Sequence, residues 1–185
     1  MAAYPRVNGA ILAGGAGTRL GGVSKAMLEL GGRPLAVHVG EVLAEVCDPV
    51  ALVCKPDTEL PPIADVERWD EPAEPRHPLT GIVHALERAG GPVLVCAVDM
   101  PWVTAVSCRS LIEAAPGAPA AVAVGEGEMC PVFAVYAPDA LATLRAAPAD
   151  APLRETLDAL DPARVAFPPA LLRSVNEPAD LNLQR

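Results

Sequence analysis

The residues with the most distinctive spacing lie near the start of the sequence, in the segment VNGAILAGGAGTRLGGVSK, which ends at Lys25. A short apolar run breaks there into a series of glycines, with Arg19 within the series and Lys25 just after it. Glycine allows the backbone to approach a ligand closely, and successive N–H groups of such a loop can surround an anion. A lysine adds a point charge that suits phosphate. This combination favours a loop that binds a phosphate chain over a glycine-rich turn without a ligand.

Two well-known phosphate-binding patterns do not fit this segment. The dinucleotide fingerprint G-x-G-x-x-G, read from Gly15, requires a third glycine where the sequence has Leu20. It also requires an acidic residue at the end of the next strand, where the sequence has Lys55. The Walker A pattern requires Gly-Lys-Ser/Thr, whereas Lys25 here follows Ser24. The sequence therefore argues against a dehydrogenase with a bound dinucleotide.

Two aspartates follow apolar segments that are expected to be strands. Asp70 follows residues 66–69, and Asp99 follows residues 92–98, the most continuous apolar run in the chain. Such a run is typical of a central parallel strand that is buried on both faces. Because ligands of α/β sheets bind at the carboxyl ends of the strands, we expect the glycine loop, Asp70 and Asp99 at one edge. A carboxylate there can hold Mg²⁺ against phosphate oxygens, and Asp99 is the predicted metal ligand.

The pattern L-A-G-G-x-x-x-R-L-G-G-x-x-K, from Leu12 to Lys25, resembles the opening signature of nucleotidylyltransferases. The family that it resembles most is that of the molybdenum cofactor guanylyltransferases (MobA-type). Shorter similarities occur at P-L-T-G (78–81), V-x-x-x-D-x-P (95–101) and V-N-E-P-x-D-L (175–181). The resemblance implies a Mg²⁺-dependent enzyme that moves GMP from GTP onto the phosphate of a molybdopterin-type cofactor and releases pyrophosphate.

The resemblance also assigns roles to individual residues. It implies nucleotide binding by Leu12, Ala13, Gly14, Gly15, Lys25, Asp70 and Asp99, catalytic roles for Lys25, Arg19 and Asp99, Mg²⁺ binding by Asp99, and acceptor binding by Asn176. For Asn176, a plain helix N-cap is an equally good interpretation. The implied partners are GTP or another NTP and the molybdopterin-type phosphate, and a cofactor-delivery protein is a further candidate.

The sequence departs from the family pattern at four positions, Ser24, Cys54, Cys130 and Ser174, where the family usually has Asp, Asn, His and Asn. These departures leave alternatives open on the acceptor side and for the choice of base. One alternative is a related transferase that uses CTP or another phosphorylated acceptor. The other is an accessory protein that binds a nucleotide without turnover.

Composition narrows the classes of function. The chain has 185 residues, which is typical of one domain (1–185), and a formal net charge of −9, which argues against nucleic acid as a partner. The sequence has no apolar run of about 18 residues, so no membrane helix is predicted. Glycine interrupts the N-terminal apolar segment too early for a signal peptide. We therefore expect a cytoplasmic protein. The five cysteines form no C-x-x-C pair, so no zinc site is predicted.

The elements that must position these residues alternate along the chain. Strands are expected at 10–13, 50–54, 66–69, 92–98, 120–124 and 132–136, with short extended pieces at 164–167 and 171–175. The strands at 120–124 and 132–136 can pair as a hairpin through the polar turn at 125–129. Helices are expected at 34–46, 81–89, 105–115 with Thr104 as the N-cap, 138–145, 152–160 and 177–183. Such alternation predicts a three-layer α/β/α sandwich around a mostly parallel, Rossmann-like sheet. The family resemblance specifies the nucleotide-diphospho-sugar transferase type of this architecture.

Overall fold

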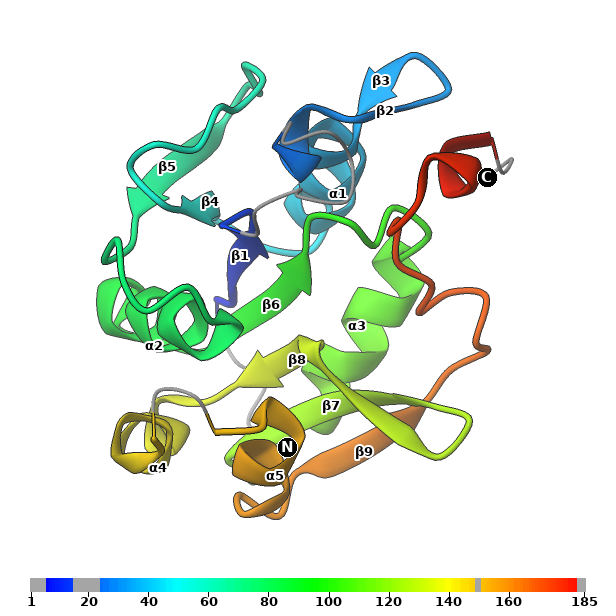
Figure 1. Ribbon diagram of the computed structural model, residues 1–185. Helices are drawn as coiled ribbons and strands as arrows, with labels where there is room; N and C mark the ends of the chain where they lie inside the picture. Colours follow the sequence, from blue (N-terminus) through cyan, green and yellow to red (C-terminus); the bar gives the residue numbers. More distant parts are fainter. Residues whose placement is uncertain (1–5, 15–23, 149–150, 183–185) are drawn as a thin grey trace.

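The computed structural model describes residues 6–14, 24–148 and 151–182, and it is built around a seven-stranded sheet in the order β5-β4-β1-β6-β8-β7-β9 (Figure 1). The strands are β1 (Asn8–Leu12), β4 (Val50–Cys54), β5 (Val66–Asp70), β6 (Val93–Ala97), β7 (Ala120–Gly125), β8 (Glu128–Tyr136) and β9 (Ala163–Ala166). Within the described part of this sheet, only β8 is antiparallel to its neighbours, β6 and β7. The expected mostly parallel sheet is confirmed.

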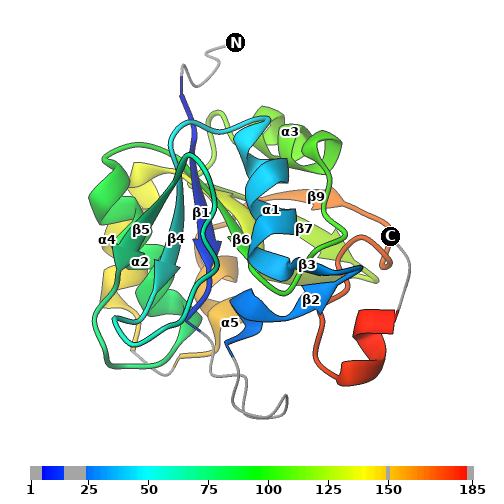
Figure 2. The same ribbon diagram turned by 90° about the horizontal axis from the view of Figure 1, so that it is seen from above.

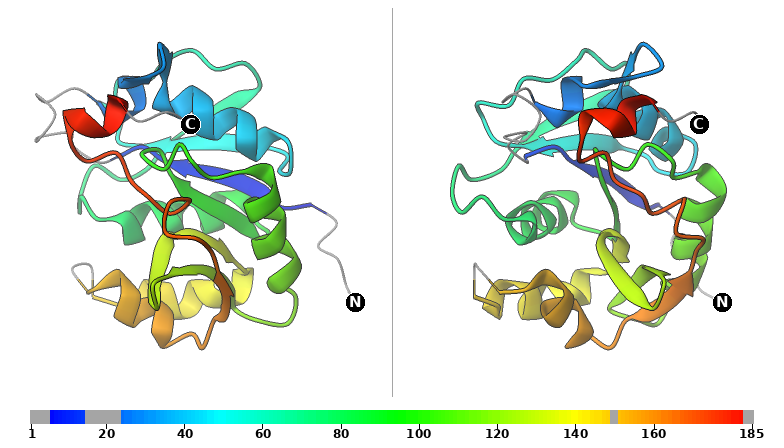
Figure 3. Two further views of the ribbon diagram at one scale, coloured as in Figure 1. Left: turned by 90° about the vertical axis from the view of Figure 1, so that its right-hand side faces the viewer. Right: turned by 45° about the vertical axis from the view of Figure 1, so that its right-hand side comes forward.

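Helices cover both faces of the sheet. They are α1 (Leu35–Ala44), α2 (Pro78–Ala89), α3 (Ala105–Ala114), α4 (Leu141–Ala146) and α5 (Leu153–Asp158), together with the 3₁₀ turns η2 (Lys25–Met27), η3 (Pro138–Ala140) and η4 (Pro178–Asn182). One apolar cluster packs α1 and α3 against the sheet, and a second packs α2, α4 and α5 against the opposite face (Figures 1 and 3). This is the expected three-layer arrangement. Within the described ranges, no helix has the length and apolar character needed to cross a membrane.

The central strands are apolar because both of their faces are covered. Every residue of β4 is buried, and so are the first four residues of β6. The register is level across the middle of the sheet, because Leu12 at the end of β1 lies opposite Val53 and Ala97. The loops that follow β1, β4 and β6 therefore leave the sheet at one edge, where α/β proteins bind their ligands.

The C-terminal segment returns to this edge. The small antiparallel pair β2 (Glu29–Leu30) and β3 (Arg33–Pro34) lies beside η4, and Figures 2 and 3 show these elements near the end toward which the arrow of β1 points. Leu30, Leu35 and Val175 form a third apolar cluster. The N–H of Val175 donates to the carbonyl oxygen of Asp99 at 2.8 Å. This packing holds residues 174–176 next to the loop that follows β6.

Two boundaries differ from the sequence-based expectation. Helix α2 begins at Pro78 and not at residue 81, because the ring of His77 accepts a hydrogen bond from the N–H of Leu79 and proline is well suited to the first helical turn. Residues 171–175 form turns and irregular backbone in place of an extended piece.

The β7–β8 hairpin is longer than expected because its connection consists of only Glu126 and Gly127. Both residues have positive φ values, 53° and 84°, as a tight hairpin turn requires. The polar segment 125–129, expected as a turn, is therefore largely part of the two strands. The predicted cap of α3 is confirmed, because Thr104 and Ser107 form a reciprocal capping box.

Candidate active site

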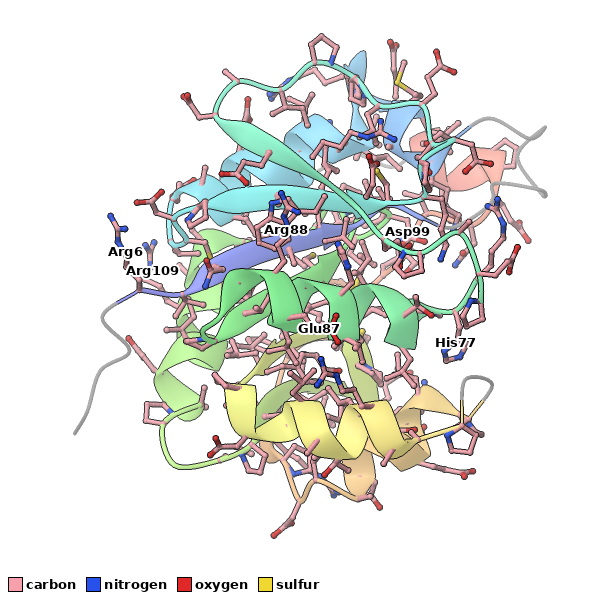
Figure 4. The ribbon with its side chains drawn as sticks, turned by 90° about the vertical axis from the view of Figure 1, so that its left-hand side faces the viewer. Arg6, His77, Glu87, Arg88, Asp99 and Arg109 are labelled. Atoms are coloured by element: carbon pink, nitrogen blue, oxygen red, sulfur yellow. The ribbon has the colours of Figure 1, made fainter. Side chains whose placement is uncertain are left out.

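A pocket of about 320 Å³ lies at the carboxyl ends of the central strands. Its walls come from the end of β1, the loop after β6, the start of α2, Lys25 and Ser174. Figure 4 shows Asp99 and His77 at this end of the molecule and Arg6 and Arg109 at the opposite end. The volume is within the range of small-molecule sites. The edge predicted from strand order is therefore the edge that carries the pocket.

Lys25 joins three segments that are far apart in the sequence. Its Nζ donates to Asp99 Oδ2 at 2.6 Å, to Asn176 Oδ1 at 3.1 Å and to the carbonyl oxygen of Val175 at 3.2 Å. The side chains of Lys25 and Asp99 are 19% and 17% exposed. The ion pair is thus held in place by the fold and remains open to a charged ligand. The predicted convergence of the N-terminal lysine and the mid-chain carboxylate is present.

The amide side chain of Asn176 faces Lys25 and does not cap a helix. The cap of this turn is provided by Asp180, whose Oδ2 accepts the backbone N–H groups of Asn176 and Glu177, each at 2.9 Å. These two hydrogen bonds hold the pKa of Asp180 below its usual value. The N-cap interpretation of Asn176 is therefore wrong, and the acceptor-binding role of Asn176 stays a prediction.

The residues of the glycine-rich segment have different positions. Leu12 and Gly14 line the pocket, whereas Ala13 is buried and its N–H donates to the carbonyl oxygen of Val53 at 2.8 Å. Ala13 therefore fixes the backbone of the segment between its two neighbours. Gly15 and Arg19, which were also assigned to the site, lie outside the described residues.

Asp70 is not brought into this pocket. Its carboxylate is about half exposed at the end of β5, where Oδ1 accepts from Arg68 Nε at 2.7 Å. The next residue, Glu71, lines the pocket instead. A nucleotide-binding role for Asp70 stays a prediction.

The sequence reasoning missed a buried ion pair in the pocket wall. Lys55 Nζ lies 3.5 Å from Glu71 Oε1, and the two side chains are 1% and 5% exposed. Lys55 also donates to the carbonyl oxygens of Pro72 at 2.6 Å and Pro75 at 3.0 Å. Burial raises the pKa of Glu71, and Lys55 opposes this shift. The available signal was position, because Lys55 directly follows β4 and Glu71 directly follows β5.

The four departures from the family pattern lie at or near this edge. Ser174 lines the pocket, while Cys54 is buried with its Sγ 3.9 Å from Asp70 Oδ1. Burial raises the pKa of Cys54 and of Cys130 to about 11, so neither thiol is an activated nucleophile. Ser24 directly precedes η2 and makes no side-chain cap bond there.

The donor set suits Mg²⁺ better than a metal that needs several protein ligands. In residues 6–14, 24–148 and 151–182, no three or more His, Cys, Asp or Glu side chains form a metal-binding group. Mg²⁺ commonly uses one or two carboxylates, retains waters and takes its other ligands from substrate phosphates. Asp99, at the pocket wall beside a lysine, fits that requirement.

Comparison with known proteins identifies the family. The model of the MobA-like NTP transferase domain matches residues 9–165. The chain belongs to this family. It is therefore a nucleotidyltransferase.

Curated relatives share about a third of their residues with this chain. "Molybdenum cofactor guanylyltransferase" from Pseudomonas putida (strain GB-1) is 33% identical over 136 residues, which cover 72% of this chain and 71% of the relative. "Probable molybdenum cofactor guanylyltransferase" from Natronomonas pharaonis is 32% identical over 167 residues, which cover 86% of this chain and 78% of the relative. These relatives place the chain in molybdenum cofactor biosynthesis.

Solved structures share the fold. Molybdopterin-guanine dinucleotide biosynthesis protein A from Archaeoglobus fulgidus has a TM-score of 0.74 at 24% identity, with 95% of each chain covered. A 2-C-methyl-D-erythritol 4-phosphate cytidylyltransferase from Thermus thermophilus has a TM-score of 0.71 at 21% identity, again with 95% of each chain covered. The nucleotide-diphospho-sugar transferase architecture is confirmed.

Proposed function

We propose that this nucleotidyltransferase moves GMP from Mg²⁺-bound GTP onto the phosphate of a molybdopterin-type cofactor and releases pyrophosphate. The observation that carries the proposal is the contact of Lys25 with both Asp99 and Asn176 at the pocket. Lys25 comes from the glycine-rich nucleotide segment, Asp99 from the end of the central strand, and Asn176 from the segment matched to the acceptor side.

The reaction requires charge stabilisation more than proton transfer. A phosphate oxygen of the acceptor attacks the α-phosphorus of the nucleotide, the bond from the α-phosphorus to the bridging oxygen breaks, and pyrophosphate leaves. Negative charge grows on the α-phosphate oxygens and on the leaving group, so fixed positive groups at these atoms lower the barrier. Lys25 supplies such a charge, and its three acceptors hold it at the pocket wall.

Asp99 would hold Mg²⁺, which supplies further positive charge to the phosphate oxygens when it is bound. Lys25 now occupies one oxygen of this carboxylate, at 2.6 Å. In the proposed complex the ammonium group moves from Asp99 toward the triphosphate, while Asn176 and the carbonyl oxygen of Val175 keep the side chain nearby. Asp99 would then be free to hold the metal, and Lys25 would remain beside the phosphates as a fixed positive charge.

The acceptor side of the proposal rests on Asn176 and on the named relatives. Ser174 and Val132 also line the pocket, so an acceptor phosphate bound beside Asn176 would approach the nucleotide from the C-terminal segment. A delivery protein would reach the same edge. We place the reaction in the cytoplasm, and the five unpaired thiols, at Cys47, Cys54, Cys96, Cys108 and Cys130, fit a reducing compartment.

The test is a pyrophosphate-release assay with Mg²⁺, each of GTP, CTP, ATP and UTP, and molybdopterin as acceptor. We expect release with GTP and molybdopterin together and none when either is omitted. Release with CTP in place of GTP would give the alternative base, and release with another phosphorylated acceptor would give the alternative substrate. GTP binding without pyrophosphate from any acceptor would contradict the proposed reaction.

A further inference from the structure

Glu71 has one carboxylate oxygen with a partner and one without. Oε1 lies 3.5 Å from the ammonium group of Lys55, whereas Oε2 is shielded from solvent and has no hydrogen-bond partner among the described residues. The side chain is 5% exposed. A buried acceptor without a partner lowers stability by roughly 1–3 kcal/mol. The unpaired oxygen therefore requires an explanation.

Lys55 cannot supply that partner. Its ammonium group has three hydrogens, and they are taken by the carbonyl oxygens of Pro72 and Pro75 and by Glu71 Oε1. Arg76, which also lines the pocket, pairs with Asp57 at 3.0 Å. Lys55 thus anchors one oxygen of Glu71 and sets the orientation of the carboxylate, and the second oxygen remains available.

The carboxylate of Glu71 occupies space that is open because two neighbouring residues are glycines without a side chain. A Cβ at Gly14 would lie 2.4 Å from Glu71 Oε1, and a Cβ at Gly81 would lie 3.1 Å from Oε2. Gly14 follows β1, and Gly81 lies in the first turn of α2. Both glycines line the same pocket as Glu71, and the apolar residues Leu12 and Pro78 lie beside them. A carboxylate between two glycines and apolar side chains suits a flat, apolar ring with N–H groups at its edge.

We infer that Glu71 reads the nucleobase, accepting N–H hydrogen bonds from the base edge on Oε2. The inference rests on the proposed function, because it places the base of the nucleotide at the end of the pocket away from Asp99. Glu71 lines the pocket, so an N–H group of a bound base can be the partner that Oε2 lacks. Guanine fits this acceptor because its N1–H and exocyclic N2 amino group are adjacent donors. Asp70, whose carboxylate is held by Arg68 outside the pocket, is the competing residue for this role.

The substitution Glu71→Gln tests the assignment by reversing the polarity of one atom. Lys55 favours the amide oxygen of the new side chain on its own side, so the amide nitrogen faces the pocket as a donor. A donor there opposes the N2 amino group of guanine and suits the 2-oxo group of xanthine. The substitution should therefore change which base is preferred, in addition to weakening binding.

The experiment measures dissociation constants by calorimetry with Mg²⁺ and GTP, ITP, XTP or inorganic tripolyphosphate, without acceptor. ITP lacks the N2 amino group, and tripolyphosphate lacks the base. We expect the unmodified protein to bind GTP at least about tenfold more tightly than ITP and XTP, since an unpaired buried acceptor strongly disfavours a ligand that lacks the donor. In Glu71→Gln, the affinity for GTP should fall about tenfold or more, and XTP should become the preferred ligand. The affinity for tripolyphosphate should be unchanged.

Two further variants keep the test decisive. Glu67→Gln makes the same chemical change on β5, where the carboxylate accepts from Trp69 Nε1 at 2.8 Å outside the pocket, and it should leave all four constants unchanged. Glu71→Asp keeps the charge beside Lys55 but withdraws it by one methylene. It should lose the discrimination between GTP and ITP even if Glu71→Gln does not fold.

The outcomes separate this inference from the proposed function. If the protein binds GTP but Glu71→Gln leaves the ratios of the dissociation constants for GTP, ITP and XTP unchanged, the role of Glu71 is overturned. The transferase proposal is then left intact. Loss of discrimination in Asp70→Asn, with none in Glu71→Gln, assigns the base to Asp70 and also overturns it. A protein that binds neither GTP nor tripolyphosphate contradicts the proposed function itself.

Discussion

The strand order β5-β4-β1-β6 separates two ion pairs of the pocket, because Lys55 and Glu71 follow β4 and β5 whereas Asp99, the partner of Lys25, follows β6. The side chains of Lys25 and Asp99 are 19% and 17% exposed, whereas those of Lys55 and Glu71 are 1% and 5% exposed. The first pair can exchange partners with a ligand, because water and ions reach both groups. The second pair is part of the protein interior, and its geometry is fixed before any ligand arrives. A site that binds reacting phosphates, whose charge changes during the reaction, and a nucleobase, whose shape does not change, would use both kinds of pair.

The largest expected effect is on stability and comes from the buried pair. Lys55→Met leaves Glu71 as an unpaired buried carboxylate and removes two donors from the carbonyl oxygens of Pro72 and Pro75. We expect the free energy of unfolding, measured with urea, to fall by about 3–5 kcal/mol, as for other broken buried pairs.

The matched control for this change is Arg154→Met. Arg154 pairs with Glu128 at the surface, with side chains 59% and 67% exposed, so its loss should change the unfolding free energy by no more than about 1 kcal/mol. Restoring an apolar match with Lys55→Met and Glu71→Leu together should recover most of the stability. Equal losses in the two single variants would show that burial does not distinguish the pairs.

The next effect is on turnover and comes from the accessible pair. Lys25→Ala and Asp99→Ala should each lower the rate of pyrophosphate release by about 10²-fold or more, the scale for removing a key electrostatic group. Their unfolding free energies should change much less than that of Lys55→Met, because both groups regain hydration when the partner is lost.

Arg109→Ala is the control for turnover, because Arg109 lies at the opposite end of the molecule (Figure 4). It should retain the normal rate. A normal rate in Asp99→Ala would remove this residue from the metal role, and a large loss of stability in Lys25→Ala would show that the accessible pair is also structural.

The same contrast explains what the sequence could predict. Asp99 follows a continuous apolar run and Lys25 follows a glycine series, so strand order alone places both at one edge. The layers of the fold follow from the alternation of apolar strands and amphipathic helices. The local expectations that failed, such as the start of α2, depended on a side-chain cap at His77 that composition does not show.

The buried pair could not be predicted in the same way. Lys55 and Glu71 are ordinary polar residues after strands, and their burial depends on the loop through Pro72 and Pro75 folding back over them. Asp70 shows the reverse case. It is the residue that matches the family pattern, but the salt bridge with Arg68 holds its carboxylate at the surface. One position along a chain at the end of a strand is enough to exchange an inward side chain for an outward one.

The smallest expected effect comes from adding one methyl group beside Glu71. In Gly81→Ala the new Cβ lies 3.0 Å from Leu12 Cδ2 and 3.1 Å from Glu71 Oε2, so it narrows the base end without touching Lys25 or Asp99. We expect KM for GTP to rise roughly tenfold, the lower end of what one methylene in a pocket changes, with kcat nearly unchanged. Helix propensity favours alanine over glycine by up to about 1 kcal/mol, so stability should not fall.

Gly40→Ala in α1 is the matched control for this substitution. Its Cβ would meet Ile63 and Ile11 at 3.6 and 3.7 Å, which is ordinary contact, on the face of the sheet away from α2. It should gain the same helix propensity and leave KM unchanged. If KM rises for Gly81→Ala and kcat falls by the same factor, the base end of the pocket also aligns the α-phosphate. The two ion pairs would then not have separate roles in base recognition and catalysis.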